Sequence, residues 1–238
     1  MNTLAIPKVS VSLETMRSFY RFAYRLAGLF VNLDAIENSV LNSRIIEYPF
    51  VLETLATARP GRVLDVGCAD AGNLVAPTLA SLGWQVHGID IRDFSLPYAG
   101  FHFLRGNMTG GTGFDDCFFD CVYAVSSIEH FGISGRYGVR ENDPEADFKA
   151  VHEVRRVLKR GAPFLLTVPY GVEGLVRPSE RVYGPSRLGR LLDGWEVRRQ
   201  IYWQLDGRGQ WHQVEEQQAA RTRTPGGVAV ALLELAHD

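Results

Sequence analysis

From residue 61 onward, short apolar runs alternate with segments long enough to form a helix, and several of these runs end in glycine or aspartate. This alternation is typical of repeated strand–helix–strand units, whose strands lie parallel in one sheet with helices on its faces. The chain is therefore expected to be an α/β protein with a doubly wound sheet. We predict seven strands, at residues 62–66, 85–89, 101–105, 117–125, 163–168, 195–202 and 228–235.

Apolar residues at helical spacing precede this sheet. They predict one helix within residues 13–30 and a second within 36–57. A break is expected at Pro49, because proline disfavours helical backbone angles in the residue before it. We expect residues 1–58 to form an N-terminal helical cap, followed by a main domain over 59–238.

Two segments of the main domain have a distinct composition. The segment 147–159 is expected to be a helix, because it begins after Pro144, has basic residues in its last turn and is followed by Gly161 as a stop. Residues 206–227 are rich in polar side chains and predict a loop or insertion between the last two strands.

Charge and composition exclude several classes of protein. A net charge of −2 and a pI near 6.3 give no broad positive field for a nucleic-acid backbone. No apolar stretch reaches the roughly 18 to 20 residues of a membrane span, and the first residues do not match a secretion signal. The cysteines Cys68, Cys117 and Cys121 fit neither a disulfide framework nor a zinc ribbon. We expect a cytoplasmic protein that binds neither nucleic acid nor metal, with Cys117 and Cys121 as small buried residues.

The segment VLDVGCADAGNL predicts a strand, a glycine-containing turn and the start of a helix. Gly67, Ala69 and Gly72 loosely match the glycine pattern of NAD-binding folds. A pyrophosphate, however, needs a middle position without a side chain, and Asp65 and Asp70 bracket the turn with negative charge. The same carboxylates attract S-adenosylmethionine (SAM), which carries a sulfonium and an ammonium. The charges therefore favour SAM, with NAD as the alternative.

Two later residues suit either cofactor. Asp90 ends the second predicted strand, where its carboxylate is placed to accept hydrogen bonds from both ribose hydroxyls. Asn107 follows the third strand and offers its amide to the edge of an adenine, although asparagine suits a turn at this position nearly as well.

Taken in order, VLDVGC, GID, FDCVYAVSSIEHFG and EVRRVLKRGAPFLLTVP resemble the class I SAM-dependent methyltransferases, of the type 11 kind, over about residues 61–170. The stretch from SSIEHFGISGRYG to VHEVRRVLKRG is similar to a bacterial and nematode branch, some of whose members are associated with surface-glycan or small-molecule synthesis. The resemblance implies a Rossmann-like, mostly parallel seven-stranded sheet with an antiparallel last strand. The residues expected to line the cofactor are Asp65, Gly67, Cys68, Ala69, Gly72, Asp90, Ile91, Asn107, Met108 and Ser126.

The loop after the fourth strand, residues 126–138, should face the transferred methyl group, because ligands of open α/β sheets lie beyond the carboxyl ends of the strands. His130 is expected to be the catalytic base that takes a proton from a substrate hydroxyl, and a structural hydrogen bond is the alternative role. The residues expected to contact the acceptor are Glu129, Arg136, Tyr137 and Tyr170.

We therefore expect a SAM-dependent methyltransferase that transfers a methyl group to an oxygen, or less favourably a nitrogen, of a small molecule or sugar. The alternatives are an NAD-dependent oxidoreductase and a catalytically silent subunit of the same fold that binds a partner. The oligomeric state is left open, a homodimer included.

Overall fold

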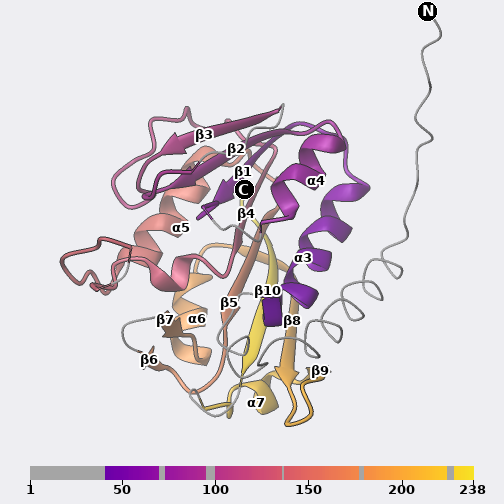
Figure 1. The fold of residues 1–238 in the computed structure, drawn as a ribbon, viewed down its shortest axis with the longest axis vertical. Helices are drawn as coiled ribbons and strands as arrows, with labels where there is room; N and C mark the ends of the chain where they lie inside the picture. The colour runs from indigo at the N-terminus through magenta and orange to yellow at the C-terminus, as the bar shows by residue number, and fades with distance from the viewer. Residues whose placement is uncertain (1–40, 70–72, 95–99, 136, 177–179, 224–227) are drawn as a thin grey trace, which may run out of the picture.

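A computed structural model of the chain describes residues 41–69, 73–94, 100–135, 137–176, 180–223 and 228–238. Its centre is one eight-stranded sheet with the order β3-β2-β1-β4-β5-β10-β8-β9 (Figure 1). The strands are β1 (Arg62–Val66), β2 (Gln85–Asp90), β3 (Phe101–Arg105), β4 (Cys121–Val125), β5 (Phe164–Pro169), β8 (Glu196–Leu205), β9 (Trp211–Val214) and β10 (Ala229–Ala236). A separate two-stranded sheet contains β6 (Gly174–Val176) and β7 (Glu180–Val182).

Strand direction agrees with the predicted fold class. The neighbours β3, β2, β1, β4 and β5 pair in parallel. The last strand of the chain, β10, lies between β5 and β8 and is antiparallel to both. This confirms the Rossmann-like, mostly parallel sheet with an antiparallel last strand.

The structure adds three strands to the seven that were predicted: β6 and β7 form the separate sheet, and the third, β9, joins the main sheet. Part of the expected loop or insertion at 206–227 forms β9, which pairs antiparallel with β8 and becomes the edge of the sheet. The short helix α7 (Glu216–Ala219) follows it. The sequence WHQV of β9 has too few apolar residues to indicate a strand without the partner beside it.

The fourth strand begins later than predicted, which changes the place of one cysteine. Cys121 opens β4 and is fully buried, as expected. Cys117 is exposed, with a φ of 52°, so its prediction as a small buried residue is wrong. The amide of Cys117 donates to the carbonyl of Arg156 at 2.9 Å, because the chain here turns past the end of the following helix before it enters the sheet.

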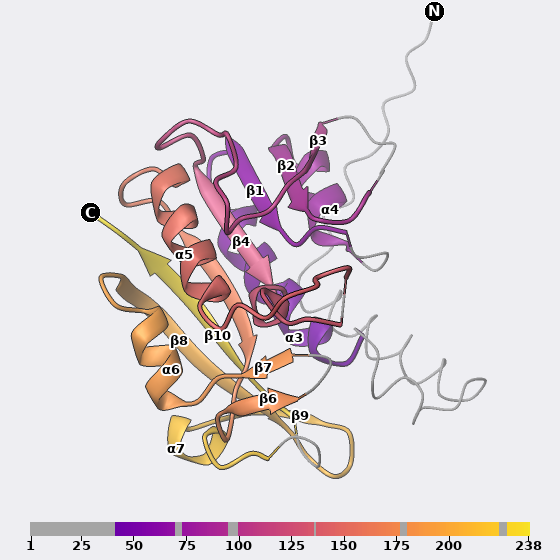
Figure 2. The same cartoon turned by 90° about the vertical axis from the view of Figure 1, so that its left-hand side faces the viewer.

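Helices cover both faces of the sheet, as in doubly wound proteins (Figures 1 and 2). On one face lie α3 (Leu41–Ala56) and α4 (Val75–Ser81), and on the other α5 (Ala146–Val157) and α6 (Pro185–Leu191). Each face has its own apolar core. The helix α5 confirms the predicted segment 147–159 but ends at Val157, four residues before Gly161, whose φ of 68° lies in the turn that leads to β5.

The helix α3 continues through Pro49, where the sequence predicted a break. Proline inside a helix costs about 3 kcal/mol. Phe50, Val51, Leu52 and Leu55 are each at most 5% exposed, and burial of such side chains stabilises by roughly 1.5–3 kcal/mol apiece. Packing against the sheet therefore outweighs the local cost of the proline.

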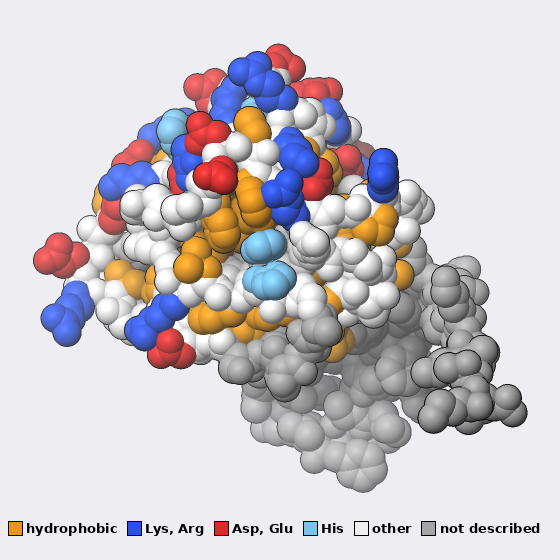
Figure 3. Space-filling view, turned by 90° about the horizontal axis from the view of Figure 1, so that it is seen from above, with side chains coloured by type: hydrophobic (Ala, Val, Ile, Leu, Met, Phe, Trp, Pro, Cys, Tyr) orange, Lys and Arg blue, Asp and Glu red, His pale blue; other side chains and the backbone are white. Residues whose placement is uncertain are grey.

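Charged side chains of both signs surround a group of apolar and histidine side chains on the face seen in Figure 3. The rings of His87 in β2 and His102 in β3 lie 5.0 Å apart, and Phe114 and Phe118 meet His87 edge-on. In the described part of the chain, no helix is both long and apolar enough to cross a membrane.

Candidate active site

A cavity of about 540 Å³ opens at the carboxyl ends of β1 to β4. Its wall includes the residues that follow each of these strands, among them Gly67, Ile91, Asn107 and Ser126. Open α/β sheets bind their ligands at this edge, and the volume suits a small-molecule site. The cavity therefore lies where the sequence predicted the ligand.

The turn after β1 requires glycine at one position. Gly67 has a φ of 80°, which is in the left-handed region, and its amide donates to the carbonyl of Ile89 at 2.8 Å. A Cβ on Gly67 would lie 2.5 Å from the Cβ of Ser127. The turn thus lets two chain segments approach closely at the floor of the cavity.

Asp65 and Asn73 hold this turn together. Asp65 is 4% exposed and lines the cavity, and its Oδ2 accepts a 2.6 Å hydrogen bond from Nδ2 of Asn73. Oδ1 of Asn73 accepts from the amides of Val75 and Ala76, which are the first residues of α4. Asn73 was not predicted, because asparagine after a glycine turn is common and its partner Asp65 was assigned to the ligand.

The carboxylate of Asp90 is occupied by protein donors. Oδ2 accepts from the amide of Ala69 at 3.0 Å and from Nη2 of Arg92 at 2.9 Å. Oδ1 accepts from the amide and from Nε of Arg92, at 2.9 Å and 3.0 Å. The guanidinium carbon of Arg92 lies 4.3 Å from the centre of the Tyr137 ring. A ribose at Asp90 must therefore displace the side chain of Arg92, a residue that the sequence did not single out.

Most of the residues predicted for the cofactor lie in the wall of the cavity. They are Asp65, Gly67, Ala69, Asp90, Ile91, Asn107, Met108 and Ser126. Oδ1 of Asn107 accepts hydrogen bonds from the amide and the hydroxyl of Thr109, both at 2.9 Å. The side chain therefore also stabilises a turn, which was the alternative role expected for it. Cys68 is fully buried and is not in the wall, because its side chain packs under Gly88 of β2. Gly72 lies outside the described residues.

A buried carboxylate from the N-terminal part of the chain supports the floor of the cavity. Glu47 in α3 is fully buried. Its Oε1 accepts from the hydroxyls of Ser126 and Thr167, and its Oε2 pairs with Arg44 at 2.5 Å. Ser126 has a φ of 41°, and these bonds help to hold it in that conformation. The only signal for Glu47 in the sequence is a charge within an apolar helix.

The 3-10 helix η1 (Ile128–His130) carries the predicted catalytic residue. His130 lines the cavity, and Glu129 lies behind it with an exposed fraction of 1%. Nε2 of His130 is 3.7 Å from Oε1 of Glu129. Burial, and then the nearby charge of Glu180, raise the pKa of the Glu129 carboxyl well above its ordinary value. Glu129 does not line the cavity, so the structure does not bring it to the place where contact with an acceptor was expected.

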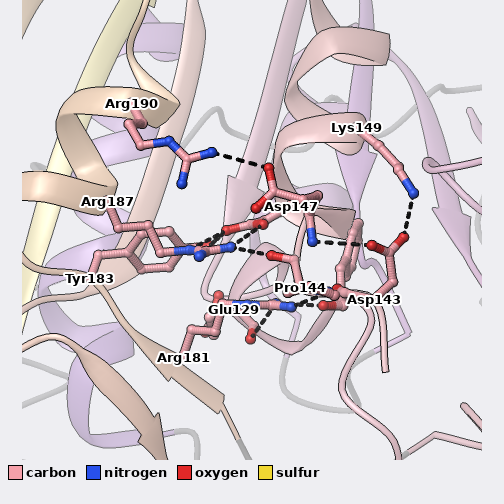
Figure 4. Close-up of polar contacts among 11 residues, drawn as sticks. Glu129, Asp143, Pro144, Asp147, Lys149, Arg181, Tyr183, Arg187 and Arg190 are labelled. Carbon is pink, nitrogen blue, oxygen red and sulfur yellow. Dashed lines mark hydrogen bonds and ion pairs between the residues drawn. The ribbon is translucent and has the colours of Figure 1, made fainter. Parts of the chain in front are cut away.

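Two arginines fix the loop that follows η1 (Figure 4). Arg181 of β7 is 6% exposed and donates to the carbonyls of Glu129 at 3.3 Å, Phe131, and Asp143 at 3.0 Å. Arg187 of α6 pairs with the fully buried Asp147 at 2.7 Å. These residues position η1, and they were missed because the sequence around Arg181 has no motif.

The remaining residues predicted to contact the acceptor lie in different places in the structure. Tyr137 lines the cavity, with a φ of 53°. Tyr170 is 1% exposed and does not reach the cavity; its hydroxyl donates to Glu216 at 2.7 Å and its ring packs on Tyr202. The structure therefore does not bring Tyr170 to the cavity where the acceptor was expected, because the side chain is fixed in the core beside α7. Arg136 lies outside the described residues.

Comparison with known proteins gives two kinds of result. A family model described as "Caenorhabditis protein of unknown function" matches residues 114–219, which is less than half of the chain. No protein of curated function matches the sequence. Sequence comparison therefore relates part of the chain to a family of unknown function and indicates no activity.

Solved structures give the fold. A putative methyltransferase from Bacillus halodurans is 14% identical, with a TM-score of 0.56 over 80% of this chain and 98% of that one. The 1,6-didemethyltoxoflavin-N1-methyltransferase of Burkholderia thailandensis, solved with S-adenosylhomocysteine, is 13% identical, with a TM-score of 0.52 over 99% and 94%. The [4+2]-cyclase SpnF is 17% identical, with a TM-score of 0.53 over 80% of each chain.

The chain has the fold of the class I SAM-dependent methyltransferases, as its sequence indicated. The strand order supports the same conclusion. In the common dinucleotide fold the strand beside the fifth is parallel to it, whereas here the antiparallel β10 occupies that place. The fold alone does not define a reaction, because a cyclase shares it.

Proposed function

We propose that the protein is a methyltransferase that binds SAM and transfers its methyl group to an oxygen, or less favourably a nitrogen, of a small molecule or sugar. The observation that carries the proposal is the buried carboxylate of Asp65 in the cavity wall beside the Gly67 turn. A cationic donor is attracted by this charge, whereas a pyrophosphate is repelled. The methyltransferase fold supports the same choice of ligand.

The acceptor end of the cavity is assigned from η1. His130 is in the cavity wall and its side chain is 13% exposed, so it meets both the cavity and the buried Glu129. An imidazole in this position suits removal of a proton from an acceptor hydroxyl. Methyl transfer also depends on holding the acceptor in line with the sulfur–carbon bond, a role that would suit the wall residues Ser126, His130 and Tyr137.

Calorimetric titration with SAM, S-adenosylhomocysteine (SAH) and NAD tests the cofactor. We expect SAM and SAH to bind and NAD not to bind. Asp65→Asn should weaken SAM binding by about tenfold, the effect of roughly 1.4 kcal/mol of lost attraction. The matched control is Asp93→Asn, because Asp93 is 79% exposed and does not line the cavity.

The other functions give different results in this titration. Binding of NAD in place of SAM would support the oxidoreductase, and binding of none of the three would support a silent subunit. Because a cyclase shares the fold, cofactor binding must be followed by transfer of a labelled methyl group to candidate sugars and hydroxylated small molecules. His130→Ala should then lower turnover more than it weakens SAH binding.

A further inference from the structure

Three side chains with the chemistry of metal ligands converge behind the cavity. Glu129 and His130 come from η1, and Glu180 comes from β7, 50 residues later in the chain. One ligand atom from each lies within 4.8 Å of the other two. This set of one imidazole and two carboxylates is assembled by the packing of β7 on η1, and the spacing in the sequence does not reveal it.

Glu129 supplies a second observation that points to a ligand. Among the described residues, its buried Oε2 has no hydrogen-bond partner. A carboxylate oxygen in the interior is normally hydrogen-bonded, ion-paired or bound to a metal. The neighbouring carboxylate of Glu180 adds a like charge to the same place. A cation between the two carboxylates would satisfy the unpartnered oxygen and remove the repulsion.

The surrounding contacts hold the three ligands in fixed positions. Arg181, directly after Glu180, donates to the main-chain carbonyls of Glu129 and Phe131 on either side of His130. The strand that carries one ligand is thereby bonded to the loop that carries the other two (Figure 4). Such preorganisation by neighbouring contacts is a general feature of metal sites.

We propose that Glu129, His130 and Glu180 bind one divalent cation of the first transition series, with Mn²⁺ or Zn²⁺ as the best match. Imidazole suits these ions better than Mg²⁺, and carboxylates suit them as well. At ligand distances of about 2.1 Å, neighbouring ligand atoms lie ~3.0–3.4 Å apart. The 3.7 Å between Nε2 of His130 and Oε1 of Glu129, and the distances of up to 4.8 Å within the set, must therefore shorten when the ion binds. Binding of the ion does not depend on the function proposed above.

A role for the ion, by contrast, rests on the proposed function. Of the three ligands, His130 also lies in the cavity wall. A coordination position of the ion that is open toward the cavity would therefore hold the acceptor oxygen. The ion lowers the pKa of a bound hydroxyl, which releases its proton to water. The oxygen then bonds to the methyl carbon as the sulfur–carbon bond breaks and leaves the neutral thioether SAH. His130 would act as a metal ligand in this arrangement and not as the base.

Mn²⁺ titration of the full chain, first freed of metal with a chelator, tests the site. Electron paramagnetic resonance measures the concentration of free Mn²⁺, and the bound amount is the difference from the total added. We expect one equivalent to bind. Glu129→Gln and Glu180→Gln should each weaken binding by at least about tenfold. Glu145→Gln is the matched control, because this partly exposed glutamate pairs with Arg190 outside the cluster. Zn²⁺ titration by calorimetry repeats the measurement.

Absence of Mn²⁺ and Zn²⁺ binding would overturn the proposal. So would binding that neither Gln variant weakens, since the ion would then lie elsewhere. Circular dichroism shows whether each variant is folded, and Glu180→Gln serves if the buried Glu129→Gln is not. SAH affinity of the metal-free protein is measured in the same samples. If the protein binds SAH but neither metal ion, only the proposed metal site is refuted. If it binds the metal ion but not SAH, only the proposed function is refuted.

Discussion

Removal of the Arg92 side chain should increase the affinity for the cofactor. The four donors on Asp90 fill the acceptor positions of its carboxylate, and two of the four are the side-chain nitrogens of Arg92. A ribose that bonds to Asp90 must break those two bonds and lift the guanidinium from the Tyr137 ring. The affinity of the unchanged protein is lowered by this cost.

The size of the effect follows from the exposure of the pair. The Arg92 side chain is 35% exposed and that of Asp90 is 5% exposed, so their ion pair contributes about 1 kcal/mol after screening by solvent. The contact with Tyr137 adds roughly 0.5–1 kcal/mol. Arg92→Ala removes both contributions before the ligand arrives, and the dissociation constant should fall by about 10- to 30-fold.

Calorimetry with SAH measures this effect without the sulfonium charge. The control is Arg105→Ala, which removes the same charge from an arginine that is 64% exposed, pairs with Asp93 and does not line the cavity. SAH affinity should be nearly unchanged in this control. With SAM, Arg92→Ala should give a larger gain than with SAH, because a positive charge near the donor is also lost. Equal or weaker SAH binding by Arg92→Ala would refute the displacement argument.

Three further predictions concern stability. Arg181→Met should lower the free energy of unfolding in urea by about 3 kcal/mol or more, because three main-chain carbonyls lose their donor; a loss below about 1 kcal/mol would contradict this. Gly67→Ala should lower the melting temperature and weaken SAH binding, because a Cβ at φ 80° meets Ser127; unchanged values of both would contradict it. Burial, followed by the charges of His102 and Arg62, lowers the pKa of the half-buried His87 to about 4 from 6.5, so the unfolded chain binds a proton more readily. Stability should fall by about 1 kcal/mol between pH 6.5 and pH 4, and urea unfolding of His87→Phe should show a smaller fall.

The fold was largely predictable because its strands are short apolar runs between glycine and aspartate. That pattern reflects burial on both faces, which needs no knowledge of which strands are neighbours. The strand β9 and the unbroken helix at Pro49 were not predictable, because each depends on the surface against which it packs. Local propensity predicts these two elements incorrectly, and tertiary contacts determine them.

The site was predictable where a residue directly follows a strand. Asp65, Gly67 and Asp90 are found in this way, since parallel strands bring their carboxyl ends together. Glu47 and Arg181 were missed because their partners are remote: Glu47 bonds to Thr167, 120 residues away, and Arg181 to the carbonyl of Glu129, 52 residues away. A single sequence carries no record of such pairs.

The contact of Glu47 with Ser126 and Thr167 has a consequence for where the functional unit begins. A chain trimmed to start at Gly61 would retain every strand of the sheet, but two hydroxyls under the cavity would lose their acceptor. A shortened version or a chimera should therefore keep α3, even though the sequence motifs that resemble methyltransferases start after it. The helix is part of the binding pocket and should be kept in any engineered version of this protein.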